Sequence, residues 1–175
     1  GFACYGIAAL LAHNEALAMM NFVISAAALG FLYYNFPKAR VFMGDAGSIP
    51  LGFLAAAMGL WGWLQGCWTV WFPLLVFSPF LADTGVTLIR RTLRGVKITE
   101  AHREHYYQRA IRMGWSHRKM ALVGYTLMLG SGISAILARD HAFPWQALLL
   151  WGCLYGTLMI ALDVAWRRTE RERHA

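Results

Sequence analysis

Long apolar stretches alternate with short polar segments along the whole chain. The apolar stretches are residues 1–12, 17–34, 50–64, 67–89, 120–138 and 144–166. They are apolar on every side instead of alternating with polar positions, which is typical of helices surrounded by lipid. A helix needs roughly 20 apolar residues to cross a bilayer. We therefore predict an all-α, polytopic membrane helix bundle of about six spans, as a single domain over residues 1–175.

The first stretch, residues 1–12, is too short to cross a bilayer, which requires roughly 20 apolar residues. It also lacks the basic flank and the small-residue cleavage site of a signal peptide. We interpret it as a truncated span. The whole sequence is then expected to be the C-terminal part of a longer protein.

Composition supports a membrane protein. The chain is 58% hydrophobic, has a mean hydropathy of +0.44 and contains eight Trp, which is rare for a soluble domain of this size. Its net charge of +7 does not indicate nucleic-acid binding, because no soluble domain carries the basic residues. The predicted partner is the lipid bilayer, and no nucleic acid is expected. Cys4, Cys67 and Cys153 show no metal-binding spacing and are interpreted as packing residues.

The basic residues predict the orientation of the spans. Six alternating spans place the loops 35–49 and 90–119 and the tail 167–175 on one side of the membrane. Of the 16 Lys and Arg residues, all but Arg139 lie in these three segments. The positive-inside rule makes this side cytoplasmic. We therefore expect a multi-pass protein of a plasma membrane with both long loops and the C-terminus in the cytoplasm.

The first polar loop places one carboxylate, Asp45, between Gly44 and Gly47. Ser48 is predicted to cap the next helix, with Pro50 in its first turn. The free N–H groups of that helix would then face whatever Asp45 faces. This arrangement suits Mg²⁺ with phosphate groups, because Mg²⁺ often binds a single protein carboxylate and phosphate oxygens. The alternative is a plain capping turn between two helices.

The second polar loop contains a dense group of functional side chains between residues 101 and 109. These are His102, Arg103, His105, Gln108 and Arg109. The two histidines share a face if the segment is helical, and the two arginines offer forks for phosphate. A zinc site lacks a third Cys or His nearby, and a basic helix lying on lipid headgroups is a further alternative. We favour binding of a phosphate or nucleotide.

Two acids lie within predicted spans. Asp83 precedes Arg90 by seven residues, which places it about 10 Å inside the membrane end of its helix. An acid at that depth faces protein or water and is a candidate functional residue, with a hydrogen bond between helices as the alternative. Asp163 is expected to pair with Arg167, four residues further along the same helix.

These motifs resemble the polyprenyl-phosphate N-acetylhexosamine-1-phosphate transferases. This is glycosyltransferase family 4, which includes relatives of phospho-N-acetylmuramoyl-pentapeptide transferase. The matching positions are Asn35, Pro37, Ala39, Phe42, Met43, Gly44, Asp45, Gly47, Ser48, Leu51 and Gly52. Residues 81–91 and 101–109 resemble the branch that initiates O-antigen-type glycans of lipopolysaccharide.

The resemblance implies transfer of a sugar 1-phosphate from a UDP-linked N-acetylhexosamine to undecaprenyl phosphate, with release of UMP. It implies a bacterial membrane enzyme that uses Mg²⁺, with Mn²⁺ as an alternative. Asp45, His102 and His105 are assigned to catalysis, with Asp45 as the metal ligand. Residues assigned to substrate binding are Asn35, Lys38, Gly47, Ser48, Asp83, Arg103, Gln108 and Arg109.

The sequence departs from the family pattern in two places. Glu104 and Tyr106 flank His105 where many members have a His-x-His-His run. The paired aspartates of the family lie upstream of the part present here, so we expect this chain alone to hold an incomplete active site. A different class of function is a transporter or flippase subunit that uses Asp83 and the Arg-rich loop to handle an anionic lipid. We favour the transferase, because a transporter would place ionisable groups near the midplane on several helices.

Overall fold

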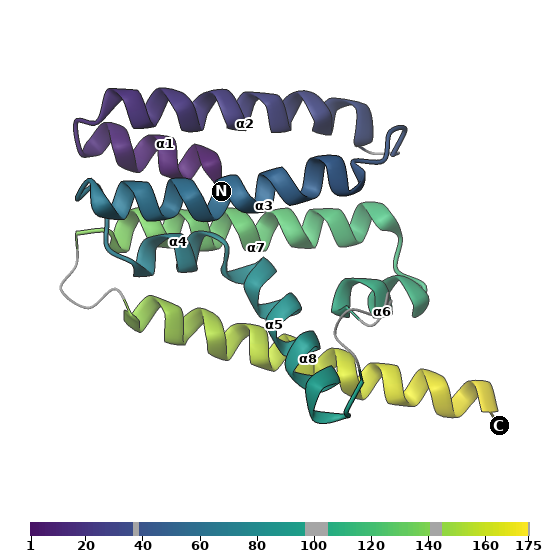
Figure 1. The fold of residues 1–175 in the computed structure, drawn as a ribbon. Coiled ribbons are helices and arrows are strands. Elements are labelled where there is room, and N and C mark those ends of the chain that lie inside the picture. Colours follow the sequence, from purple (N-terminus) through teal and green to yellow (C-terminus); the bar gives the residue numbers. More distant parts are fainter. Residues whose placement is uncertain (37–38, 97–104, 141–144, 175) are drawn as a thin grey trace.

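The computed structural model describes residues 1–36, 39–96, 105–140 and 145–174, and all its regular elements are helices (Figure 1). The helices are α1 (Phe2–Leu11), α2 (Glu15–Asn35), α3 (Gly44–Leu64), α4 (Trp71–Val76), α5 (Ser78–Leu93), α6 (Tyr106–Arg112), α7 (His117–Ala138) and α8 (Trp145–His174). The predicted all-α membrane bundle is confirmed. The placement of Lys38, His102 and Arg103 falls outside the described residues.

Among the described residues, α2, α3, α7 and α8 are long and apolar enough to cross a membrane, and α1 is a shorter apolar helix. Large apolar side chains point outward from these helices, such as Leu29, which is 62% exposed, and Leu150, which is 72% exposed. An outer surface of this kind is expected where lipid replaces water around the bundle.

The predicted continuous span over residues 67–89 is wrong. It is divided into α4 and α5, which meet between Val76 and Ser78. The Ser78 hydroxyl contacts the Leu75 carbonyl oxygen at 2.7 Å and shares a 2.8 Å hydrogen bond with the Tyr155 hydroxyl of α8. Pro79 follows and has no N–H to continue a helical ladder. The break is thus fixed by a proline and by contacts with a distant helix.

The core is formed by α1, the start of α2, the turn before α4 and α4 itself, and α3 packs against it. Tyr5 is fully buried, stacks on Trp68 with ring centroids 5.1 Å apart, and donates to the Ala55 carbonyl oxygen at 3.2 Å. The Trp68 indole N–H donates to the carbonyl oxygen of Gly59 at 2.9 Å. A methyl group at Gly59 would lie 2.7 Å from the Tyr5 hydroxyl, so only glycine permits this close approach.

The polar segments gather at one end of the bundle, as the charge pattern predicted. The C-terminal end of α2, the start of α3, helix α6 and the C-terminal end of α8 lie on the right in Figure 1. Arg139 lies at the opposite end, where it donates to the Ala8 carbonyl oxygen at 2.8 Å and pairs with Asp140 at 2.9 Å. The functional side chains therefore share one end of the molecule.

Candidate functional site

Helix α3 begins at Gly44, earlier than the sequence predicted. The proposed cap at Ser48 is wrong, because Ser48 lies in the second turn and Pro50 lies inside the helix. Gly44 has a φ of +58°, which allows the chain to turn sharply into α3. Asp45 consequently lies in the first turn itself. A negative charge there is favoured by the free N–H groups and the helix dipole.

The Asp45 carboxylate is exposed and, within the described residues, makes no hydrogen bond or ion pair. These residues also hold no group of three or more His, Cys, Asp or Glu arranged around a metal. A lone carboxylate of this kind fits Mg²⁺, which completes its shell with phosphate oxygens and water. Gly47 and Ser48 follow within one turn on the same helix.

Asn35 shapes the connection that leads to Asp45. Its side-chain carbonyl accepts from the backbone N–H groups of Arg40 and Val41, each at 3.2 Å, and its amide donates to the Phe31 carbonyl oxygen at 3.1 Å. Asn35 was assigned to substrate binding from the sequence. In the structure it holds the returning chain against the end of α2 and thereby positions the start of α3.

Asp83 lies beside His105, although they are far apart in the sequence. The Asp83 carboxylate accepts from the Tyr106 backbone N–H at 2.9 Å and lies 3.7 Å from Nδ1 of His105. Both side chains are less than a quarter exposed, at 22% and 23%. Asp83 therefore caps the first turn of α6. This contact is a hydrogen bond between helices, which is the alternative role that the sequence offered for Asp83.

We expect Asp83→Ala to loosen α6. Loss of a cap of this kind costs about 1 kcal/mol, so the amides of α6 should exchange hydrogen several times faster in mass spectrometry while α7 stays protected. Asp83→Asn keeps an oxygen acceptor and should preserve much of the protection. Equal exchange in wild type and Asp83→Ala would show that the cap does not hold α6.

Asp163 joins three helices, and its predicted pairing with Arg167 is wrong. Its carboxylate accepts from both terminal guanidinium nitrogens of Arg90 in α5, from Nη1 of Arg109 in α6 at 3.0 Å, and from the Tyr106 hydroxyl at 3.2 Å. The carboxylate is only 17% exposed and Arg109 13%. Charge-assisted bonds of this geometry fix the arginines more firmly than a surface pair along one helix.

Tyr106 lies between the two arginines that Asp163 holds. The guanidinium carbons of Arg90 and Arg109 lie 5.3 and 5.4 Å from the centre of its ring. These are cation–π distances. Burial, followed by the charge of Asp163, raises the pKa of Tyr106 above its ordinary value. The hydroxyl therefore stays protonated at neutral pH and keeps donating to Asp163.

A groove of about 640 Å³ opens beside this cluster, between α5, α6 and α8. We call it the arginine groove. It is lined by Arg90, Leu93, Arg94, Arg109, Arg112, Asp163, Trp166, Arg167 and Glu170. Five arginines face two acids, so the groove is positively charged and suits phosphate or diphosphate groups.

The sequence identified only part of this groove. Arg109 was assigned to substrate binding and does line it, whereas Gln108 donates to the Tyr107 hydroxyl at 3.2 Å and does not. Arg90 and Arg112 were not assigned a role, and Asp163 was expected only to pair with Arg167. One feature of the sequence could have pointed to these residues: they lie in or next to the segments predicted to share one side of the membrane.

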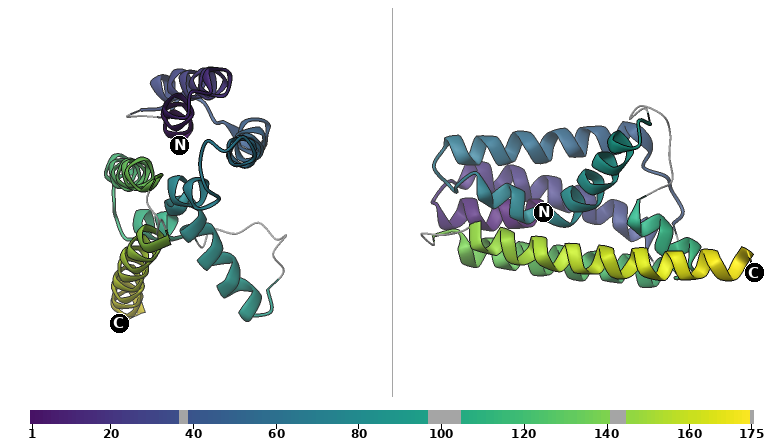
Figure 2. Two further views of the ribbon diagram at one scale, coloured as in Figure 1. Left: turned by 90° about the vertical axis from the view of Figure 1, so that its left-hand side faces the viewer. Right: turned by 90° about the horizontal axis from the view of Figure 1, so that it is seen from below.

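The described residues do not bring Asp45 into the arginine groove. The groove is formed by α5, α6 and α8, whereas Asp45 opens α3. The left view of Figure 2 shows α3 on one side of the bundle and α7 and α8 on the other. The site therefore has two described parts at one end of the molecule: a free carboxylate and a basic groove.

A family model described as glycosyl transferase family 4 matches residues 1–62. This match covers α1, α2 and most of α3, including the Asp45 motif. Together with the relatives that follow, it confirms the resemblance drawn from the motifs. No solved structure matches the chain significantly.

Three curated relatives illustrate the likeness. The Bacillus subtilis protein named "Probable undecaprenyl-phosphate N-acetylglucosaminyl 1-phosphate transferase" is 31% identical over 152 residues, which are 86% of this chain and 42% of the relative. The "Decaprenyl-phosphate N-acetylglucosaminephosphotransferase" of Mycolicibacterium smegmatis is 32% identical over 150 residues, covering 77% and 36%. A "Phospho-N-acetylmuramoyl-pentapeptide-transferase" of a Synechococcus strain is 30% identical over 159 residues, covering 90% and 38%. The chain thus spans less than half of each relative.

Proposed function

Because this chain belongs to glycosyl transferase family 4, we propose that it forms part of an enzyme that loads a lipid carrier with a sugar. The enzyme transfers a sugar 1-phosphate from a UDP-linked N-acetylhexosamine to undecaprenyl phosphate and releases UMP. The product starts a glycan of the bacterial cell envelope. The observation that carries this proposal is the exposed carboxylate of Asp45 in the first turn of α3, within the Phe42-Met43-Gly44-Asp45 motif.

The reaction replaces one phosphorus–oxygen bond with another. An oxygen of the lipid phosphate attacks the phosphorus that carries the sugar, and the bridging oxygen leaves with UMP. Negative charge crowds around that phosphorus, so positioning and charge neutralisation dominate catalysis. Mg²⁺ held by Asp45, or Mn²⁺ in its place, supplies neutralisation when bound. The start of α3 adds N–H groups directed at the same anions.

We assign the arginine groove to the phosphate groups of the nucleotide. Its five arginines provide planar forks that match phosphate oxygens, and the Asp163 contacts hold Arg90 and Arg109 in place. His105 directly precedes α6, the helix that contributes Arg109 and Arg112 to the arginine groove. This end of the bundle is proposed to face the cytoplasm, where nucleotide sugars occur, in agreement with the positive-inside rule.

The test uses the full-length natural protein in detergent, incubated with undecaprenyl phosphate, Mg²⁺ and single UDP-N-acetylhexosamines. We expect UMP release with at least one donor, and we expect it to require both the lipid and the metal. The active donor identifies the sugar. Absence of UMP with every donor, from a preparation that melts cooperatively, would contradict the proposed reaction.

A further inference from the structure

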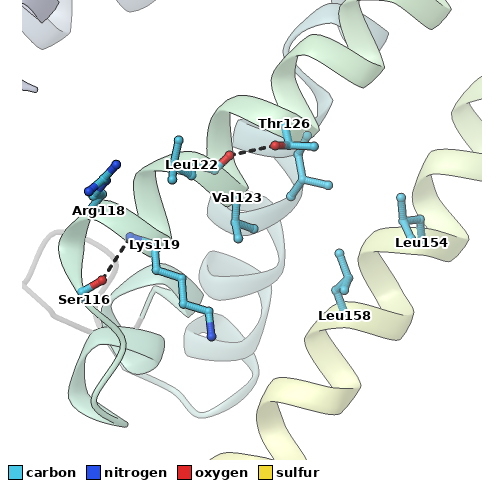
Figure 3. A pocket seen from close by; sticks show the side chains of 9 residues that line it. Ser116, Arg118, Lys119, Leu122, Val123, Thr126, Leu154 and Leu158 are labelled. Atoms are coloured by element: carbon cyan, nitrogen blue, oxygen red, sulfur yellow. Dashed lines mark hydrogen bonds between the residues drawn. The ribbon is translucent and has the colours of Figure 1, made fainter. Parts of the chain in front are cut away.

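A second cavity, of about 610 Å³, lies between α7 and α8, and we call it the α7–α8 groove (Figure 3). Leucines from both helices line its length, among them Leu122, Leu127, Leu154 and Leu158. The Thr126 hydroxyl donates to the Leu122 carbonyl oxygen at 2.9 Å, so it is satisfied within its own helix. The body of the groove is therefore an apolar surface that suits a hydrocarbon chain.

One end of this groove is cationic. Lys119 points into the space between α7 and α8 in Figure 3. Arg118 is also among the lining residues, although its side chain is directed away from α8. The Lys119 ammonium lies 4.0 Å from the centre of the Trp115 ring, which fixes it at the mouth. The lining residues, all within the described part of the chain, include no acid to neutralise these two charges.

We propose that the α7–α8 groove binds one anionic membrane phospholipid. The lipid phosphate contacts Lys119, Arg118 adds a second positive charge at the same end, and one acyl chain lies along the leucines of α7 and α8. The match is one of charge and polarity: a cationic mouth at the membrane boundary above an apolar trough. Anionic headgroups are concentrated at the leaflet that basic juxtamembrane residues face.

The α7–α8 groove is distinct from the arginine groove, which we assign to the nucleotide. The groove shares no residue with the arginine groove, and it lies on helices that the left view of Figure 2 shows across the bundle from α3. A phospholipid held by Lys119 therefore leaves the arginine groove open to the nucleotide. The bound phospholipid joins α7 to α8, and α8 also carries Asp163.

The test measures lipid retention by native mass spectrometry of the full-length protein, titrated with phosphatidylglycerol or with phosphatidylcholine. We expect wild type to retain phosphatidylglycerol preferentially. The double variant Arg118→Gln/Lys119→Gln should lose about fivefold in retention for each cation removed and keep its weak binding of phosphatidylcholine. Arg168→Gln removes one charge from an exposed position of α8 outside both grooves and should bind as wild type does.

A second pair of variants tests the apolar wall without changing charge. Leu158→Trp should fill the trough and lower phosphatidylglycerol retention, whereas Leu150→Trp on the outer surface of α8 should not. Equal retention of the two phospholipids by wild type, or unchanged retention in both the double variant and Leu158→Trp, would overturn the proposal. Displacement of phosphatidylglycerol by an equal amount of a polyprenyl phosphate would also overturn it, because the groove would then be a carrier site. Neither measurement needs turnover, so the result is independent of the proposed reaction.

Discussion

Replacing Asp45 with asparagine in the full-length protein is expected to abolish UMP release, with a loss on the order of 10³-fold or more. Asparagine keeps the size of the side chain and an oxygen, but it removes the negative charge that holds the metal. The anions would then face the start of α3 without the cation that brings them together. UMP release at saturating donor and lipid is the measurement that checks this.

A separate readout distinguishes metal binding from a folding defect. Asp45 is exposed, so the substitution should change the melting temperature in detergent only slightly. Added Mg²⁺ should raise the melting temperature of the wild type but not of Asp45→Asn, because a bound ligand stabilises only the protein that binds it. Glu172→Gln removes an exposed carboxylate of α8 that lines neither groove and serves as the control. Normal turnover by Asp45→Asn would remove Asp45 from the site.

The apolar runs predicted most of the helices because a membrane span is defined by its own composition. The predicted spans 17–34 and 120–138 correspond to α2 over Glu15–Asn35 and α7 over His117–Ala138. Each begins with a side chain that accepts from the first turn, Asn14 from the Leu17 N–H and Ser116 from the Lys119 N–H. Hydrophobic length and local capping are both properties of neighbouring residues, so they can be read from sequence.

Two fold predictions failed: the continuous span over residues 67–89 and the helix start at Ser48. Both features depend on more than the neighbouring residues in the sequence. The break between α4 and α5 involves a hydrogen bond between Ser78 and Tyr155, which belongs to α8. The start of α3 depends on the positive φ of Gly44, which the sequence permits but does not require. A serine followed by proline two residues later is also a good helix start. Local rules favoured that start, and the folded chain uses another.

The sequence predicted several residues of the site, but it did not predict the contacts between them. Sequence reasoning selected Asp83, His105 and Arg109 as individual candidates, but it did not predict that Asp83 caps α6 or that Arg109 pairs with Asp163. The rule for pairs along one helix favoured Arg167 as the partner of Asp163. Arginines from α5 and α6 reach the same carboxylate instead. Such contacts arise from the packing of helices, which residue spacing does not encode.

Asp163→Ala is expected to impair turnover although Asp163 touches neither the metal nor the reacting phosphate in the proposed mechanism. It is a positioning residue: without it, Arg90, Arg109 and the Tyr106 hydroxyl lose their common acceptor. Loss of such a supporting partner typically costs 10–100-fold, and we expect a higher KM for the UDP-sugar because the arginine groove loses its shape. Stability should fall by about 1–3 kcal/mol, since partly buried charges are left without their partner.

Comparing Asp163→Asn with Asp163→Ala distinguishes loss of the negative charge from loss of the hydrogen-bond acceptor. Asp163→Asn retains one acceptor, so its KM for the UDP-sugar should lie between those of wild type and Asp163→Ala. Glu172 is an exposed acid further along α8, and Glu172→Gln should leave the kinetics unchanged. Steady-state kinetics with the donor varied, together with melting temperatures, check these expectations. A KM and kcat equal to wild type in Asp163→Ala would show that the arginines it holds do not bind the donor. The arginine groove would then be a structural junction between α5, α6 and α8, and the phosphate contacts would have to come from other residues.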